Sequence, residues 1–113
     1  MSHTIESPGG IVLEEFESLG YGGFPDRLFL ISVGQDKYAA NNATLPDGQR
    51  VDGLATFPDP DEATTYMGLL AGLSGEIVTK TFEQAREIAK SKPKLSAVFL
   101  FVAGRIVEVH YVR

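Results

Sequence analysis

The pair of residues best suited to acid–base chemistry is Glu108 and His110, which lie two positions apart near the end of the chain. Residues two apart in a strand point to the same side, so the carboxylate and the imidazole can interact. A glutamate of this kind can orient a histidine that acts as a general base. The histidine can equally be a structural hydrogen-bonding residue. Together with Tyr21 and Phe99, the pair defines a candidate pocket for a small ligand.

Other catalytic and metal-binding chemistries have little support. The chain has no cysteine, which excludes disulfides, thiolate zinc sites and cysteine nucleophiles. Asp59, Asp61 and Glu62 are hard-metal ligands by type, but they lack the alternating spacing of a calcium loop. Ser74 lies between glycines, yet the second glycine is one position too early for a nucleophile elbow. We predict no catalytic residue, no metal site and no cofactor.

The charges are distributed unevenly along the chain. Residues 1–62 have eleven acidic and three basic residues, whereas residues 63–113 have four acidic and seven basic residues. The net charge of −5 disfavours nucleic acid as a partner. Five basic residues lie within fifteen positions around one predicted helix: Lys80, Arg86, Lys90, Lys92 and Lys94. They indicate either a solvated helix face or a patch that binds an anion or an acidic partner.

Two helices have clear starting signals. Asp59 can cap free amides, Pro60 suits the first helical position, and Glu62 can complete a capping box. Apolar residues at three- and four-residue steps then predict one buried stripe: Ala63, Tyr66, Met67, Leu70 and Leu73. Thr81 and Gln84 form a second capping box, which predicts a helix that ends before Pro93.

Strands are predicted where β-prone residues cluster. Residues 28–33 and 51–57 have this character, and residues 77–78 form a shorter run. Between the first two, Asn41-Asn42 and Pro46-Asp47-Gly48 indicate a mobile loop or a wide hairpin.

The C-terminal residues predict a hairpin of strands 95–102 and 105–112, joined by Ala103-Gly104. A two-residue loop would place Phe99 opposite Glu108 and Ala97 opposite His110. One face of this ribbon is then too apolar to meet water and must be covered by residues 11–25 or by a second copy. Its apolar members, the candidate dimer face, are Phe99, Phe101, Ile106 and Val112.

The predicted fold class is therefore α+β, in one domain over residues 11–113 behind a flexible tail at residues 1–10. We expect a single mixed or mostly antiparallel sheet with two helices on one face, in the order β-β-α-β-α-β-β. Residues 11–19 predict an additional short helix, although their first residues could open a strand.

A resemblance covers about a third of the chain. The run from Phe57 to Leu70, with its acidic residues followed by Ala63-Thr64-Thr65-Tyr66, resembles a small cyanobacterial and chloroplast family of unknown function. The order of elements is also similar to the N-terminal domain of the enhanced-serine-sensitivity family, although Pro58 stands where that family favours threonine. Neither resemblance implies a catalytic residue, and both point away from enzymes.

The expected function is that of a non-enzymatic, homodimeric interaction or regulatory module. The alternative is a small-ligand-binding protein or weak enzyme that uses the pocket near Glu108 and His110. Residues 1–10 lack a secretory signal, and no run of the sequence has the length of apolar residues that a membrane span needs. We therefore expect a soluble cytoplasmic protein without nucleic-acid or membrane partners.

Overall fold

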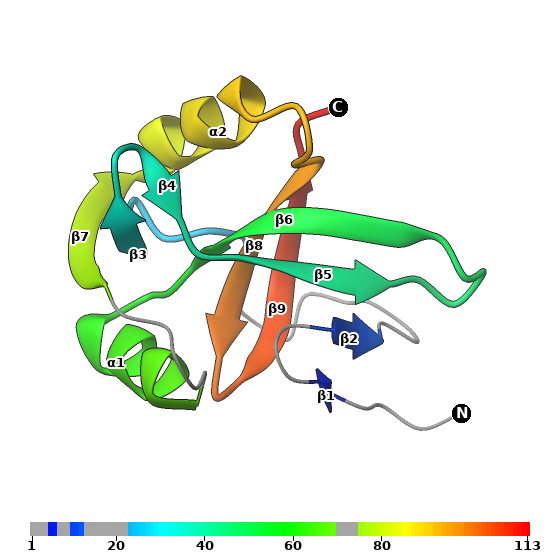
Figure 1. Cartoon of the computed structure of the whole chain (residues 1–113), viewed down its shortest axis with the longest axis horizontal. Helices are drawn as coiled ribbons and strands as arrows, with labels where there is room; N and C mark the ends of the chain where they lie inside the picture. Colours follow the sequence, from blue (N-terminus) through cyan, green and yellow to red (C-terminus); the bar gives the residue numbers. More distant parts are fainter. Residues whose placement is uncertain (1–4, 7–9, 13–22, 70–74) are drawn as a thin grey trace.

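The computed structural model of the chain describes residues 5–6, 10–12, 23–69 and 75–113. These residues form two β-sheets and two helices, which confirms the α+β class (Figure 1). The spatial order of the large sheet is β1 (Ile5–Glu6), β2 (Gly10–Val12), β5 (Ala40–Thr44), β6 (Arg50–Thr56), β8 (Ala97–Val102) and β9 (Arg105–Tyr111). The order of the small sheet is β4 (Lys37–Tyr38), β3 (Arg27–Gly34) and β7 (Glu76–Thr81). The helices are α1 (Pro60–Leu69) and α2 (Phe82–Ser91).

The two sheets, which replace the single sheet expected, are joined through the middle of the chain. Ala39 separates β4 from β5; its amide donates to Ile31 of β3, and its carbonyl accepts from Ala55 of β6. Phe29 and Phe57 exchange two backbone hydrogen bonds of 2.9 Å, which tie β3 to the end of β6. One run of backbone thus pairs first with the small sheet and then with the large one.

The helices cover opposite faces of the large sheet, and the expectation of two helices on one face is wrong. Ala63 and Tyr66 of α1 pack in one apolar cluster with the aromatic rings of β8. Ala85 and Ala89 of α2 pack in a second cluster with leucines and valines from the other side of β6, β8 and β9. Strand β8 can serve both clusters because its alternate side chains are buried on both faces.

The helix starts form where the sequence predicts them. The Asp59 carboxylate accepts the amide of Glu62 at 2.9 Å, so Asp59 caps α1. The Glu62 side chain differs from the expected capping box because it accepts the Ala103 amide at 2.8 Å and so ties α1 to the C-terminal hairpin turn. At α2, both capping-box bonds between Thr81 and Gln84 are present at 3.0 Å.

The C-terminal hairpin has the predicted turn but a different register. Val102 pairs with Arg105 across Ala103 and Gly104, which both have positive φ. A bulge then inserts one residue into β9, so that Glu108 pairs with Leu100 and His110 with Val98. The predicted pairing of Phe99 with Glu108 is therefore wrong. A one-residue slip moves every following side chain to the other face of the sheet.

The remaining segments refine the predicted order. Residues 37–38 and 40–44, within the predicted loop or wide hairpin, form β4 and β5, and Leu45 and Gly48 close the turn between β5 and β6. Residues 1–10, for which a flexible tail is predicted, contribute β1 and the first residue of β2. Ile11 and Val12 lie in β2, which pairs in parallel with β5, while the rest of the predicted N-terminal helix lies outside the described residues. No helix within the described ranges is long and apolar enough to cross a membrane.

Candidate functional site

The structure separates the members of the pocket predicted around Glu108 and His110. Both side chains lie on the α2 side of β9, whereas Phe99 lies on the α1 side of the sheet. Glu108 is buried and accepts the Gly23 amide at 3.1 Å. The His110 ring packs edge-on against Phe82 of α2, with ring centroids 5.1 Å apart. Glu108 and His110 thus hold other parts of the fold in place. Tyr21, the fourth member of the predicted pocket, lies outside the described residues.

The predicted dimer face is internal. Phe99, Phe101 and Ile106 have exposed fractions of 0%, 1% and 7%, and they lie in the cluster that α1 covers. The ring of Phe101 contacts Tyr66 of α1 at a centroid distance of 5.1 Å. Val112 packs against the other cluster. The prediction of these residues as a dimer face is therefore wrong, because the chain buries three of them and turns the fourth elsewhere; self-association itself stays a prediction.

The predicted anion patch divides into separate surfaces. Lys92 and Lys94 lie at one groove, and Lys80 lies at a neighbouring crevice. Arg86 makes an ion pair of 2.5 Å with Glu83 one helical turn away. Lys90 is exposed in the last turn of α2 and lines neither cavity. The structure thus brings two of the five predicted basic residues to one site.

That site is a groove of about 540 Å³ between the β3–β4 hairpin and the loop that follows α2. We call it the lysine-rimmed groove. Its lining is mainly apolar, and Leu54 of β6, which is fully buried, belongs to the cluster beneath α2. The lining residues are Val33, Lys37, Tyr38, Ala40, Leu54, Lys92, Pro93, Lys94 and Leu95.

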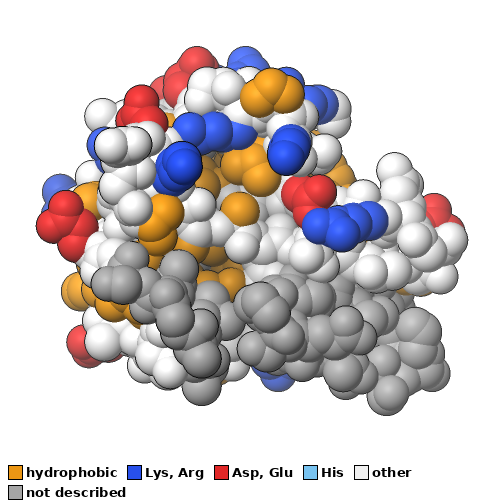
Figure 2. Space-filling model, viewed as in Figure 1, with side chains coloured by type: hydrophobic (Ala, Val, Ile, Leu, Met, Phe, Trp, Pro, Cys, Tyr) orange, Lys and Arg blue, Asp and Glu red, His pale blue; other side chains and the backbone are white. Residues whose placement is uncertain are grey.

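Figure 2 views this face directly. Apolar side chains are visible between α2 and the strands β4 and β6, and Lys and Arg side chains stand around them. Lys37 and Lys94 are exposed, and none of the three groove lysines makes an ion pair with a carboxylate of the described residues. The groove therefore combines an apolar surface with positive charges that the described part of the fold leaves uncompensated.

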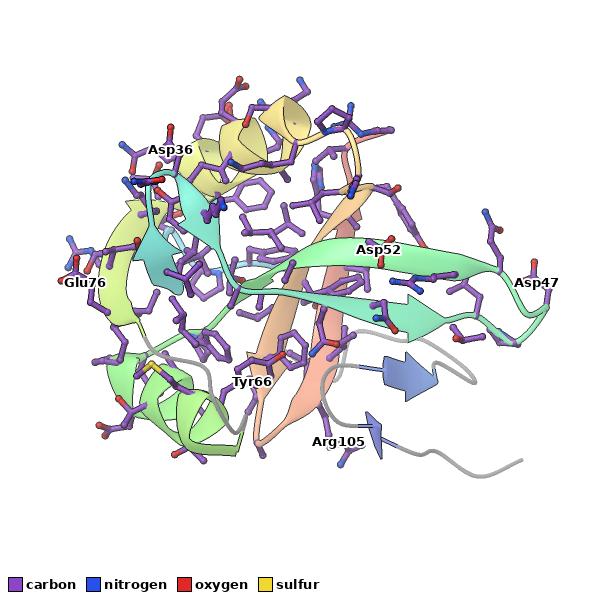
Figure 3. The ribbon with its side chains drawn as sticks, in the orientation of Figure 1. Asp36, Asp47, Asp52, Tyr66, Glu76 and Arg105 are labelled. Atoms are coloured by element: carbon purple, nitrogen blue, oxygen red, sulfur yellow. The ribbon has the colours of Figure 1, made fainter. Side chains whose placement is uncertain are left out.

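One wall of the groove depends on a tight turn. Gln35 and Asp36 both have positive φ, which lets β3 reverse directly into β4 and places Lys37 at the rim. The Lys92 ammonium donates to the backbone carbonyl of Asp36 and so joins the two walls. Figure 3 shows Asp36 at this turn, close to α2.

The other wall depends on Arg113. Its guanidinium donates to the carbonyls of Ala89 and Lys90 at the end of α2 and to those of Lys92 and Leu95 in the following loop, at 2.6–3.2 Å. The carbonyls of Ala89 and Lys90 lie in the last turn of α2, where carbonyls lose their regular helical amide partners. Arg113 thus fixes the segment that contains two groove lysines.

A smaller crevice of about 350 Å³ lies on the other side of Tyr38. Asp36, Glu83, Glu87 and Lys80 contribute charges of both signs to its lining. The three carboxylates outnumber the single lysine, so this crevice lacks the excess positive charge of the lysine-rimmed groove.

A buried polar pair on the α1 side of the large sheet has a structural role. The Asn41 amide donates to the Tyr66 hydroxyl inside the aromatic cluster, and Figure 3 shows Tyr66 directed from α1 toward the large sheet. Burial raises the pKa of the Tyr66 phenol, and the hydrogen bond from Asn41 opposes part of that increase. The neutral phenol is therefore the form that the fold favours.

Sequence reasoning missed Lys37 and Arg113. Lys37 is isolated among polar turn residues, and Arg113 acts on carbonyls more than fifteen positions away. No local pattern indicates either role. In the described part of the chain, no three His, Asp or Glu side chains are grouped to hold a metal ion. Comparisons with family models, curated proteins and solved structures return no match for this chain.

Proposed function

We propose that this protein is a non-enzymatic binding module whose binding site is the lysine-rimmed groove. The observation that carries the proposal is an apolar groove of about 540 Å³, a volume within the roughly 300–1,000 Å³ of small-molecule sites. Glu108 and His110, the residues best suited to catalysis, support the non-enzymatic part because each has a packing or backbone-bonding role.

The composition of the groove favours recognition of an apolar group. Tyr38, Leu54 and Leu95 also pack in the cluster beneath α2, so a bound apolar group would extend an existing core. Val33 is 37% exposed, which is unusual among the large aliphatic residues that the structure describes. Covering such surface is favourable by about 25 cal/mol per Å² of apolar area removed from water.

The test is binding of the neutral dye Nile red, measured by its fluorescence, combined with amide chemical shifts of the isotopically labelled chain. We expect the dye to bind and to shift the amides of Val33, Tyr38 and Leu95. The variant Ala40→Phe should abolish binding, because residue 40 is exposed in the groove and a phenyl ring there fills it.

Asn42→Phe is the matched control. Residue 42 lies two positions along the same strand, on the same face, but does not line the groove. It should leave dye binding unchanged, and circular dichroism should show both variants folded. Absence of dye binding to the unmodified protein, or equal binding by Ala40→Phe, would contradict the proposal.

A further inference from the structure

We infer that the ligand of the lysine-rimmed groove is an amphipathic anion, a single carboxylate or phosphate attached to an apolar chain or ring. This inference rests on the proposed function and adds the chemical class of the ligand. It is carried by the arrangement of three lysines around an apolar lining.

The lysines contribute from both walls. Lys37 stands on the β3–β4 hairpin, while Lys92 and Lys94 stand on the loop after α2. An anionic group at the rim can therefore be approached from two sides. Lys92 uses one of its three N–H donors on the Asp36 carbonyl, which positions the ammonium and leaves two donors for a ligand.

Of the two cavities described above, only the lysine-rimmed groove has a lining whose charged residues are all basic. The chain as a whole has a net charge of −5, and the neighbouring crevice mixes Lys80 with three carboxylates. An anion is therefore repelled by the protein on average and attracted at the groove. A neutral or cationic ligand of the same shape gains nothing from the lysines, so the charge distribution selects for anions.

The type of basic side chain determines how selectively the groove recognises the head group of a ligand. Lysine is a point charge on a flexible stem, whereas arginine holds carboxylate and phosphate in a fixed two-bond geometry. Since no arginine lines the groove, either head group can bind, and the apolar lining must supply much of the affinity. A small anion without an apolar part should therefore bind poorly.

The experiment titrates the labelled full-length chain with decanoate and decyl phosphate below their micelle concentrations, with decanol below its solubility limit, and with acetate. We expect both long-chain anions to shift the amides of the groove residues. The affinity for decanol should be lower than theirs by a factor of about five or more. Acetate should give no saturable shifts. Each exposed ion pair typically changes affinity by about two- to fivefold. The double variant Lys37→Gln/Lys94→Gln should therefore weaken the long-chain anions by about tenfold and leave decanol unchanged.

Lys80→Gln/Lys90→Gln is the control, because it removes the same net charge outside the groove and should leave all affinities unchanged. Equal affinities for decanol and decanoate, or equal losses in both double variants, would overturn the inference while the groove remained a binding site. Saturable acetate binding at the decanoate affinity would overturn the amphipathic requirement. Failure of every probe together with Nile red would overturn the proposed function itself.

Discussion

The two faces of the large sheet are covered by different kinds of side chain. On the α1 face, large rings fill the space: Phe57, Tyr66 and Phe101 have centroid separations of 5.0–5.8 Å, and Phe99 stands edge-on to Phe101. On the α2 face, the helix presents Ala85 and Ala89, whose small side chains let it lie close to the strands.

The difference between the two faces explains where a ligand can bind. The aromatic cluster leaves Phe57, Phe99 and Phe101 at most 1% exposed. The α2 face remains open where the helix ends at Ser91, and there Leu54 and Leu95 line the groove. A face closed by aromatic rings contributes stability, whereas a face covered by a short helix leaves surface for recognition.

The largest expected effect is a difference in stability between variants of the closed α1 face and of the open α2 face. Phe99→Ala should lower the free energy of unfolding by about 3–5 kcal/mol, because it leaves a cavity in a fully buried aromatic cluster. Val33→Ala at the groove should cost less than about 1 kcal/mol, because that side chain is already partly in water. Urea unfolding measures both. Similar losses for the two variants would contradict the difference between the faces.

The closed face also requires a glycine. A Cβ on Gly53 would lie 2.7–2.8 Å from three ring atoms of Phe99, closer than real side chains approach. Gly53→Ala should therefore cost about 1–3 kcal/mol of stability in urea unfolding. Combining it with Phe99→Leu should give a loss smaller than the sum of the two single losses, since the shorter side chain relieves the overlap. Strict additivity would show that the ring does not lie over Gly53.

Arg113 tests the open face. Arg113→Ala removes the side-chain hydrogen bonds to the end of α2 and should cost about 1–2 kcal/mol in thermal or urea unfolding. It should also weaken Nile red binding, because the loop with Lys92 and Lys94 loses its anchor. Arg105→Ala is the control: residue 105 is exposed in β9, and Figure 3 shows it far from the groove. Equal effects of the two variants would contradict the role assigned to Arg113.

The smallest effect concerns the pKa of Tyr66. Because burial raises this pKa above the ordinary value of 10.0, the folded chain keeps the phenol protonated where the unfolded chain ionises it. The associated stability is present below about pH 10 and is lost as pH rises through the folded-state pKa. Ultraviolet titration should show a late-ionising phenol that Tyr66→Phe removes and Tyr38→Phe retains. Loss of that late phase in Tyr38→Phe, with retention in Tyr66→Phe, would contradict the assignment.

Local signals explain which parts of the fold the sequence predicts well. The caps at Asp59 and Thr81 and the turn at Ala103-Gly104 depend on residues within a few positions of one another, and all three form. Strands β4 and β5 were predicted only as a loop or wide hairpin, because Ala40, Asn41 and Asn42 lack an alternating apolar pattern. Strand β4 is held by pairing with β3, and β5 by pairing with β6, so both depend on partners elsewhere in the chain.

The candidate site depended on tertiary structure. The sequence by itself determined the α+β class, both helix starts and the cluster of basic residues near α2. Only the fold decided that a bulge turns Glu108 and His110 away from Phe99. It also decided that three of the four candidate dimer-face residues are buried in the cluster that α1 covers, and that Lys37 and Arg113 meet the loop after α2. The physical reason is range: caps and turns are settled by neighbours along the chain, whereas a groove is formed by side chains that only packing brings together.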